Sequence, residues 1–176
     1  MPSTTSVRVE ASGPGSGAVG GGVATAMLRI GWPDGAQLEA RFAMLFADLD
    51  KFKAVNDELG HAAGDLVLKQ FAEIIRQSIR SSDIAARFGG DEFVIVLENT
   101  SLDNAECVAT RIQQQVNCWA NENGIYFSVT FGLGEAPTHG DNFHSLLEQV
   151  DRALYHSKTA HTGGGLAHAQ CRQTVS

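Results

Sequence analysis

The sequence predicts an α+β fold, in which a mostly antiparallel central sheet is flanked by helices. Short apolar and β-branched stretches alternate with longer stretches in which apolar residues recur every three or four positions. The first kind is typical of strands, and the second is typical of helices that bury one face. They follow the order β-α-α-β-β-α-β-α, with a Gly-Gly turn between the middle two strands. This order predicts the ferredoxin-like or palm-type architecture.

The first strand and the two helices after it form the first half of the pattern. Residues 43–49 are apolar except for Asp48 near their end, and they indicate a buried strand. A short helix is expected over residues 52–59, closed by Gly60. A longer helix should open at Gly64 and end near Arg80. Its buried face is predicted to consist of Leu68, Phe71, Ala72, Ile75 and Ile79.

A hairpin and a third helix come next. Residues 84–88 and 93–97 are predicted to be its two strands, because both are short and rich in β-branched or aromatic residues. Ser101 and Asp103 are both candidate caps for the helix that follows. Its apolar stripe is Val108, Ile112, Val116 and Trp119. The remaining elements are an alternating strand over 126–133 and a helix after Asp141 and Asn142.

Composition limits the classes of partner. The chain has 176 residues, of which 43% are apolar and 19% are charged, as expected for one globular domain. Its net charge of −7 argues against a nucleic-acid polymer, which binds to basic surfaces, but permits a single nucleotide whose phosphates are neutralised by metal ions. The three cysteines form no metal-ligand pattern. With no signal peptide or membrane segment evident, a reduced, cytoplasmic protein is the simplest interpretation.

The two ends of the chain differ from the middle. Residues 1–24 are rich in Gly, Ser and Thr, so we expect a flexible leader. The irregular stretch up to Arg41 completes an atypical N-terminal segment, 1–41. The folded domain is predicted over residues 42–160, and a disordered tail over 161–176.

Acidic residues gather at the predicted strand ends. Asp48 closes the first strand, while Asp91 and Glu92 directly follow the glycines of the hairpin, Gly89 and Gly90. Glycine lets the backbone approach a ligand closely, and carboxylates bind Mg²⁺ together with phosphate oxygens. These positions predict a divalent cation beside a phosphate. The alternative is that the strand-end aspartates cap the next helix and that the hairpin carboxylates are merely solvated.

A longer run makes the resemblance specific. From Asp48 to Asp65 the sequence is Asp-Leu-Asp-Lys-Phe-Lys-Ala-Val-Asn-Asp-Glu-Leu-Gly-His-Ala-Ala-Gly-Asp, with Gly-Gly-Asp-Glu-Phe following downstream. Together these resemble the GGDEF domain of diguanylate cyclases, and matching elements extend from about Phe42 to Lys158. The resemblance implies that two GTP molecules, one on each of two facing domains, are joined into cyclic di-GMP with release of pyrophosphate. The implied partners are therefore GTP, cyclic di-GMP and a second copy in a transient or ligand-bridged homodimer.

The resemblance also implies a metal site. Asp48 and Asp91 would coordinate two Mg²⁺ (or Mn²⁺) ions with help from the Leu49 carbonyl. Glu92 would either join them or deprotonate the attacking 3′-hydroxyl. A metal pair can clamp the attacking and leaving oxygens of an in-line displacement.

The implied nucleotide contacts lie on both sides of that site. Asn56 and Asp65 would bind guanine, whose edge offers two donors beside an acceptor. Lys53 and Lys158 would neutralise phosphates. The backbone near Phe52, Gly89 and Gly90 would lie against the nucleotide. Without the resemblance, each residue has an ordinary structural explanation. Asp65 would be a helix cap, Asn56 would belong to a polar helix face, and each lysine would simply be solvated.

A second site is implied at Arg80-Ser81-Ser82-Asp83. At this offset before the Gly-Gly turn, the family's Arg-x-x-Asp binds cyclic di-GMP and inhibits the enzyme. The alternative is an ordinary arginine at a helix end beside an aspartate cap. Guanidinium groups suit guanine edges and phosphates, which favours the inhibitory site.

The chain departs from the family pattern at three places. No Asp-x-Leu-Thr-Gly-Leu-x-Asn-Arg element precedes Asp48, His161-Thr162-Gly163 stands where Gly-Arg-Asn is common, and Gly132 replaces a small hydroxyl residue. These departures leave a second hypothesis, a weakly active or non-catalytic domain that senses cyclic di-GMP. A third is that the N-terminus is not native to the domain.

Overall fold

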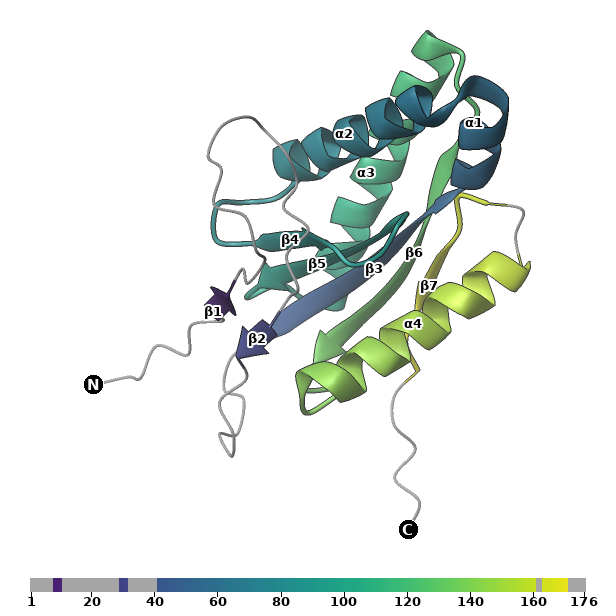
Figure 1. Ribbon diagram of the computed structural model, residues 1–176. Helices are drawn as coiled ribbons and strands as arrows, with labels where there is room; N and C mark the ends of the chain where they lie inside the picture. Colours follow the sequence, from purple (N-terminus) through teal and green to yellow (C-terminus); the bar gives the residue numbers. More distant parts are fainter. Residues whose placement is uncertain (1–7, 11–28, 32–40, 161–162, 171–176) are drawn as a thin grey trace.

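The core of the molecule is a five-stranded sheet in the order β4-β5-β3-β6-β7 (Figure 1). The computed structural model describes residues 8–10, 29–31, 41–160 and 163–170. All neighbouring strands are antiparallel except β6 and β7, which confirms the predicted fold class. The strands are β3 (Phe42–Asp50), β4 (Ile84–Arg87), β5 (Glu92–Glu98), β6 (Ser128–Ala136) and β7 (Leu166–His168). The helices are α1 (Phe52–Leu59), α2 (His61–Ser78), α3 (Leu102–Asn123) and α4 (Phe143–Ala160).

Helices cover both faces of the sheet. Successive strand side chains point to opposite faces, so alternate residues of β3 enter two separate cores. Leu45 and Leu49 pack with Phe71 of α2 and Ile112 of α3. Met44, Phe46 and their neighbours instead pack with α4. Figure 1 shows α2 and α3 on one side and α4 on the other.

Strand β6 lies especially close to α4. A Cβ atom at Gly132 would lie 2.2 Å from the Val150 carbonyl oxygen and 2.7 Å from the Leu154 nitrogen. Both atoms belong to the helix backbone, so any side chain here would push α4 away. This packing gives a local reason for glycine at the position where the family pattern has a hydroxyl residue.

Most predicted elements are confirmed, with shifted ends. α1 spans the predicted residues, and Ser101 is the cap of α3, because its Oγ accepts from the Asn104 amide. The helix expected to open at Gly64 begins earlier, at His61, since Gly60 adopts a positive φ (φ 87°, ψ 164°) that glycine tolerates and that ends one helix directly before the next. The strand expected from residue 126 begins at Ser128.

The expectations for the chain ends need two corrections. A disordered tail over 161–176 is wrong for Leu166–His168, which form β7 in parallel pairing with β6. A flexible leader over 1–24 is wrong for β1 (Arg8–Glu10), which pairs antiparallel with β2 (Arg29–Gly31). Backbone pairing stabilises both segments, and composition alone does not reveal it. The rest of the predicted leader and tail lies outside the described residues.

None of the helices within the described ranges is both long enough and apolar enough to cross a bilayer.

Candidate functional site

The predicted metal residues meet where β3 ends and β5 begins. Asp48 and Glu92 are directly opposed in the antiparallel register. The Leu49 amide donates to the Asp91 carbonyl oxygen at 3.0 Å, which ties the hairpin to the end of β3. Three carboxylates from two distant segments of sequence therefore lie at one edge of the sheet.

Lys158 approaches the same cluster from the last turn of α4. Its ammonium forms an ion pair with Asp48, and its Nζ lies 3.7 Å from Asp50 Oδ1. The lysine side chain is 33% exposed, against 16% for Asp48, so the pair is only partly accessible to water. The lysine expected at the phosphates is thus placed beside the carboxylates.

Burial and crowding disfavour the charged carboxylates. Burial raises the pKa of the Asp48 carboxyl; Lys158 opposes this rise, and the charges of Asp91 and Asp50 add to it. Burial also raises the pKa of the Glu92 carboxyl, as do the charges of Asp48, Asp91 and Asp151. One ammonium does not balance this many acids, so a bound cation would relieve their repulsion.

The donor set fits a magnesium ion that also binds phosphate. Among the described residues, no group of three or more His, Cys, Asp or Glu side chains is arranged to hold a metal alone. Mg²⁺ commonly takes only one or two carboxylates and completes its shell with phosphate oxygens and water. Asp48 and Asp91 offer carboxylates, while the Leu49 side chain is a buried hydrocarbon with no ligand atom, so that residue can contribute only its backbone carbonyl. Mn²⁺ suits the same oxygen ligands.

The Gly-Gly turn is held in place by Arg87, a residue that the sequence analysis missed. Its guanidinium donates to the carbonyl oxygens of Gly89 at 3.0 Å and of Gly90 at 2.6 Å. The amides of Phe88 and Gly89 donate to the Glu92 carbonyl oxygen. The signal available in the sequence was an arginine two residues before the Gly-Gly turn.

Glycine at position 89 makes room for the Glu92 carboxylate. A Cβ atom there would lie 2.5 Å from Glu92 Oε2, so the side chain of Glu92 folds over this glycine. Around Gly90 the same test finds nothing within 4 Å, which leaves that part of the turn open. The two glycines therefore differ: Gly89 leaves room for the Glu92 side chain, and Gly90 leaves open space beside the turn.

The predicted guanine residues meet at the corner between α1 and α2. Asn56 lies on α1, and its Oδ1 would be only 1.9 Å from a Cβ atom at Gly64 on α2. Asp65, the next residue, is exposed and sits in the fifth position of α2. It is therefore not an N-cap, which removes the alternative explanation for this acid.

The start of α1 also rules out the capping alternative for the strand-end aspartates. The N-cap of this helix is Lys51, in the left-handed region at φ 62°, and it receives no side-chain cap bond. Asp48 and Asp50 are engaged elsewhere. In the first turn, Lys53 is exposed, whereas Phe52 packs partly against the core.

The predicted inhibitory residues lie on the turn between α2 and β4. The two oxygens of Asp83 accept from the Arg80 amide at 2.8 Å and from the Glu98 amide at 3.1 Å. Because Glu98 ends the strand that Glu92 begins, this turn is about 20 Å from the metal cluster along β5. Asp83 thus has a structural role in this turn. Arg80 contributes its backbone amide to the turn, while the residue itself is exposed to solvent.

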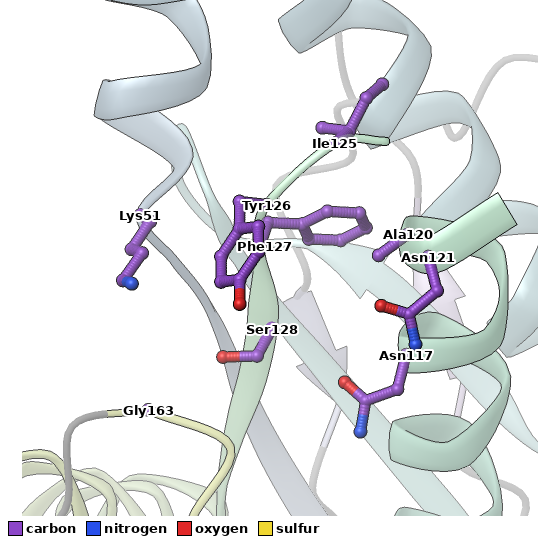
Figure 2. A pocket seen from close by; sticks show the side chains of 9 residues that line it. All are labelled: Lys51, Asn117, Ala120, Asn121, Ile125, Tyr126, Phe127, Ser128 and Gly163. Atoms are coloured by element: carbon purple, nitrogen blue, oxygen red, sulfur yellow. The ribbon is translucent and has the colours of Figure 1, made fainter. Parts of the chain in front are cut away.

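A pocket of about 320 Å³ lies beside the turn after β3 (Figure 2). Figure 2 shows Tyr126 and Ser128 of the β6 side opposite Asn117 and Asn121 of α3. None of the predicted site residues lines it. Its full lining is Lys51, Asn117, Ala120, Asn121, Ile125, Tyr126, Phe127, Ser128 and Gly163.

Known proteins resemble the chain over this whole region. A family model described as "Diguanylate cyclase, GGDEF domain" matches residues 23–163, beginning upstream of the expected domain start. Diguanylate cyclase A of Treponema denticola is 42% identical over 123 residues, 66% of this chain and 32% of that protein. The chain spans a third or less of the length of the first curated relatives that it matches.

Two solved structures share the fold. The GGDEF domain of PA1120 from Pseudomonas aeruginosa gives a TM-score of 0.67 at 36% identity, over 76% of this chain and 84% of that chain. The GGDEF domain of DgcB from Caulobacter crescentus, solved in complex with c-di-GMP, gives a TM-score of 0.60 at 26% identity, over 73% of this chain and 78% of that chain.

Proposed function

The chain belongs to the diguanylate cyclase family of GGDEF domains, and on that premise we propose that it joins two GTP molecules into cyclic di-GMP. Each 3′-hydroxyl oxygen bonds to the α-phosphorus of the other nucleotide, and each bond from that phosphorus to pyrophosphate breaks. The observation that carries the proposal is the Asp48–Glu92 pair across β3 and β5, with Asp91 and Lys158 beside it. Under this proposal the chain synthesises cyclic di-GMP in the cytoplasm.

Asp48, Asp91 and the Leu49 carbonyl would hold the metal, with Glu92 either joining them or accepting a proton. When bound, Mg²⁺ or Mn²⁺ neutralises phosphate charge and orients the attacking and leaving oxygens. The raised pKa of Glu92 suits a group that takes a proton from the 3′-hydroxyl. Phosphoryl transfer depends mainly on such positioning and charge neutralisation.

The nucleotide itself would lie along the loop from β3 to the corner of α1 and α2. Asn56 and Asp65 would bind the guanine edge, since a carboxylate accepts from its donors and an amide can do both. Lys53 and Lys158 would bind phosphates, with the backbone near Phe52, Gly89 and Gly90 close to them. Each domain provides half of the reacting pair, so turnover requires a homodimer, transient or bridged by ligand.

Product inhibition is proposed at Arg80 and Asp83. The exposed guanidinium supports it, because a nucleotide can reach it without unfolding the turn. DgcB, which shares the fold, was solved with c-di-GMP bound.

The test is direct. Purified chain with GTP and Mg²⁺ should form cyclic di-GMP at a rate that rises faster than linearly with protein concentration. Asp91→Ala should abolish the product, whereas Asp103→Ala, which removes an exposed carboxylate in the first turn of α3, should not. Absence of product at high protein concentration with Mg²⁺ or Mn²⁺ would refute the cyclase. Cyclic di-GMP binding in that case, lost in Arg80→Ala, would identify a sensor instead.

A further inference from the structure

We propose that Asp50 is a positioning residue of the predicted nucleotide site, acting through Lys158 and the Gly163–Gly165 segment without binding the metal itself. The inference rests on the proposed function, because it concerns how this chain prepares that site. Asp50 lies two residues after Asp48, at the end of β3, and its side chain is only 10% exposed.

One oxygen of Asp50 is already occupied by hydrogen bonds. Its Oδ2 accepts from Ser128 Oγ at 2.9 Å, from Thr130 Oγ1 at 2.7 Å and from the Gly164 amide at 2.9 Å. A carboxylate oxygen with three donors has little capacity left for a metal ion. This oxygen instead joins the end of β3 to the start of β6 and to the segment after α4.

The other oxygen faces Lys158. Asp50 Oδ1 lies 3.7 Å from the Lys158 Nζ, while the same ammonium pairs with Asp48. The lysine is therefore held between two carboxylates, one predicted to bind metal and one not. When Asp48 binds a cation, the Asp50 charge remains to keep Lys158 at the phosphates.

The Gly163–Gly165 segment is clamped from two sides. Gln113 of α3 donates from Nε2 to the carbonyl oxygens of Gly164 at 3.2 Å and Gly165 at 3.0 Å, as Asp50 accepts from the Gly164 amide. A Cβ atom at Gly163 would lie 2.9 Å from Ser128 Oγ and 3.3 Å from Asp50 Oδ2. In Figure 2 the Ser128 hydroxyl points toward the side of the pocket where Lys51 and Gly163 lie.

The clamped segment packs against the C-terminal end of α4, where a Cβ atom at Gly165 would lie 2.3 Å from Ser157 Oγ. Lys158 is two residues before the end of α4, and the clamped segment follows shortly after. β7, which continues from it, pairs with β6. Asp50 thus positions Lys158 twice, by charge and through the backbone that follows its helix.

Two substitutions separate these roles. Asp50→Asn keeps an oxygen acceptor but loses the charge, and Asp50→Ala loses both. We expect Asp50→Asn to weaken GTP binding about 10-fold, as expected for a lost charge-assisted contact, and to speed amide exchange at Gly164 much less than Asp50→Ala does, because an acceptor remains. Asp50→Ala should weaken binding and also speed that exchange. Ser128→Ala, which removes one donor and keeps the charge, should leave GTP affinity within about twofold.

Binding measurements show whether the effect passes through Lys158. Calorimetric GTP titrations are made with Asp50→Asn, Lys158→Met and the double variant at several Mn²⁺ concentrations. If Asp50 acts through Lys158, the double variant binds GTP no more weakly than Lys158→Met alone. The Mn²⁺ concentration that half-supports GTP binding should rise in Asp48→Asn and stay unchanged in Asp50→Asn.

Several outcomes overturn the inference. Wild-type GTP affinity in Asp50→Asn would leave the residue a purely structural role. A shift in the Mn²⁺ requirement like that of Asp48→Asn would make it a metal ligand, and additive losses in the double variant would remove Lys158 as intermediary. If the wild type binds GTP but forms no cyclic di-GMP, the proposed function fails while these measurements still decide the role of Asp50. A wild type that binds no GTP refutes both.

Discussion

Replacing Gly64 by alanine should separate the stability of this protein from its proposed recognition of guanine. The new methyl carbon would lie 1.9 Å from Asn56 Oδ1 and 2.9 Å from its Cγ. Both atoms belong to the end of a partly exposed side chain, so Asn56 can rotate away while the backbone stays in place. The substitution therefore moves the predicted guanine ligand without removing it.

The two expected effects have opposite signs. Alanine in a helix interior is about 1 kcal/mol more favourable than glycine, so α2 should gain or keep its stability. Displacing Asn56 loses one or two hydrogen bonds to the base, about 1–3 kcal/mol, which corresponds to an increase of about 5- to 150-fold in KM for GTP. Since Asn56 is only moved, kcat at saturating GTP should change much less.

The assay is cyclic di-GMP formation against GTP concentration, with thermal unfolding on the same samples. Asn56→Ala gives the reference loss, and the double variant should be no worse than the worse single variant, because both act on one contact. Gly124→Ala is the matched control, with a positive φ of 63° and nothing within 4 Å of its added Cβ. It should lower stability and leave KM unchanged. An unchanged KM in Gly64→Ala, or additive losses, would refute the guanine role of Asn56.

Three further predictions concern other parts of the site and the fold. Glu92→Gln should have a higher Tm than the wild type at pH 7 without metal. The pKa of Glu92 is raised in the folded state, so ionisation of its carboxylate lowers the stability of the wild type as the pH rises through that pKa. The difference in Tm should vanish in acid, and a lower Tm for the variant at pH 7 would contradict this. Gly132→Ala should lower the free energy of unfolding by about 1–3 kcal/mol in urea titrations, because its Cβ meets the α4 backbone, and wild-type stability would contradict the packing. Arg80→Ala should relieve inhibition by added cyclic di-GMP and leave Tm unchanged. Asp83→Ala should also lower Tm, because two backbone amides lose their acceptor. Equal inhibition of Arg80→Ala and the wild type would exclude the site.

Local patterns explain why so much of the fold could be predicted. Helix periodicity and the Gly-Gly turn depend on neighbours a few positions away, so α1, α3 and the β4–β5 hairpin follow from the residues themselves. The segments that were predicted wrongly owe their structure to distant partners. β7 is only three residues long, Leu-Ala-His, and shows no strand pattern of its own, so only its pairing with β6 makes it a strand.

The site divides in the same way. Much of its predicted chemistry lies in short segments of sequence. Asp91 and Glu92 directly follow Gly89 and Gly90, and Asn56 comes three residues after Lys53, so the backbone fixes these spacings locally. The sequence by itself therefore determined the family, the metal carboxylates and the guanine residues as predictions. Only the tertiary structure decided that Arg87 braces the turn, that Gly64 leaves room for the Asn56 side chain, and that Asp50 accepts from the Gly164 amide 114 residues away. Such contacts depend on how sheet and helices pack, and no local pattern encodes that packing.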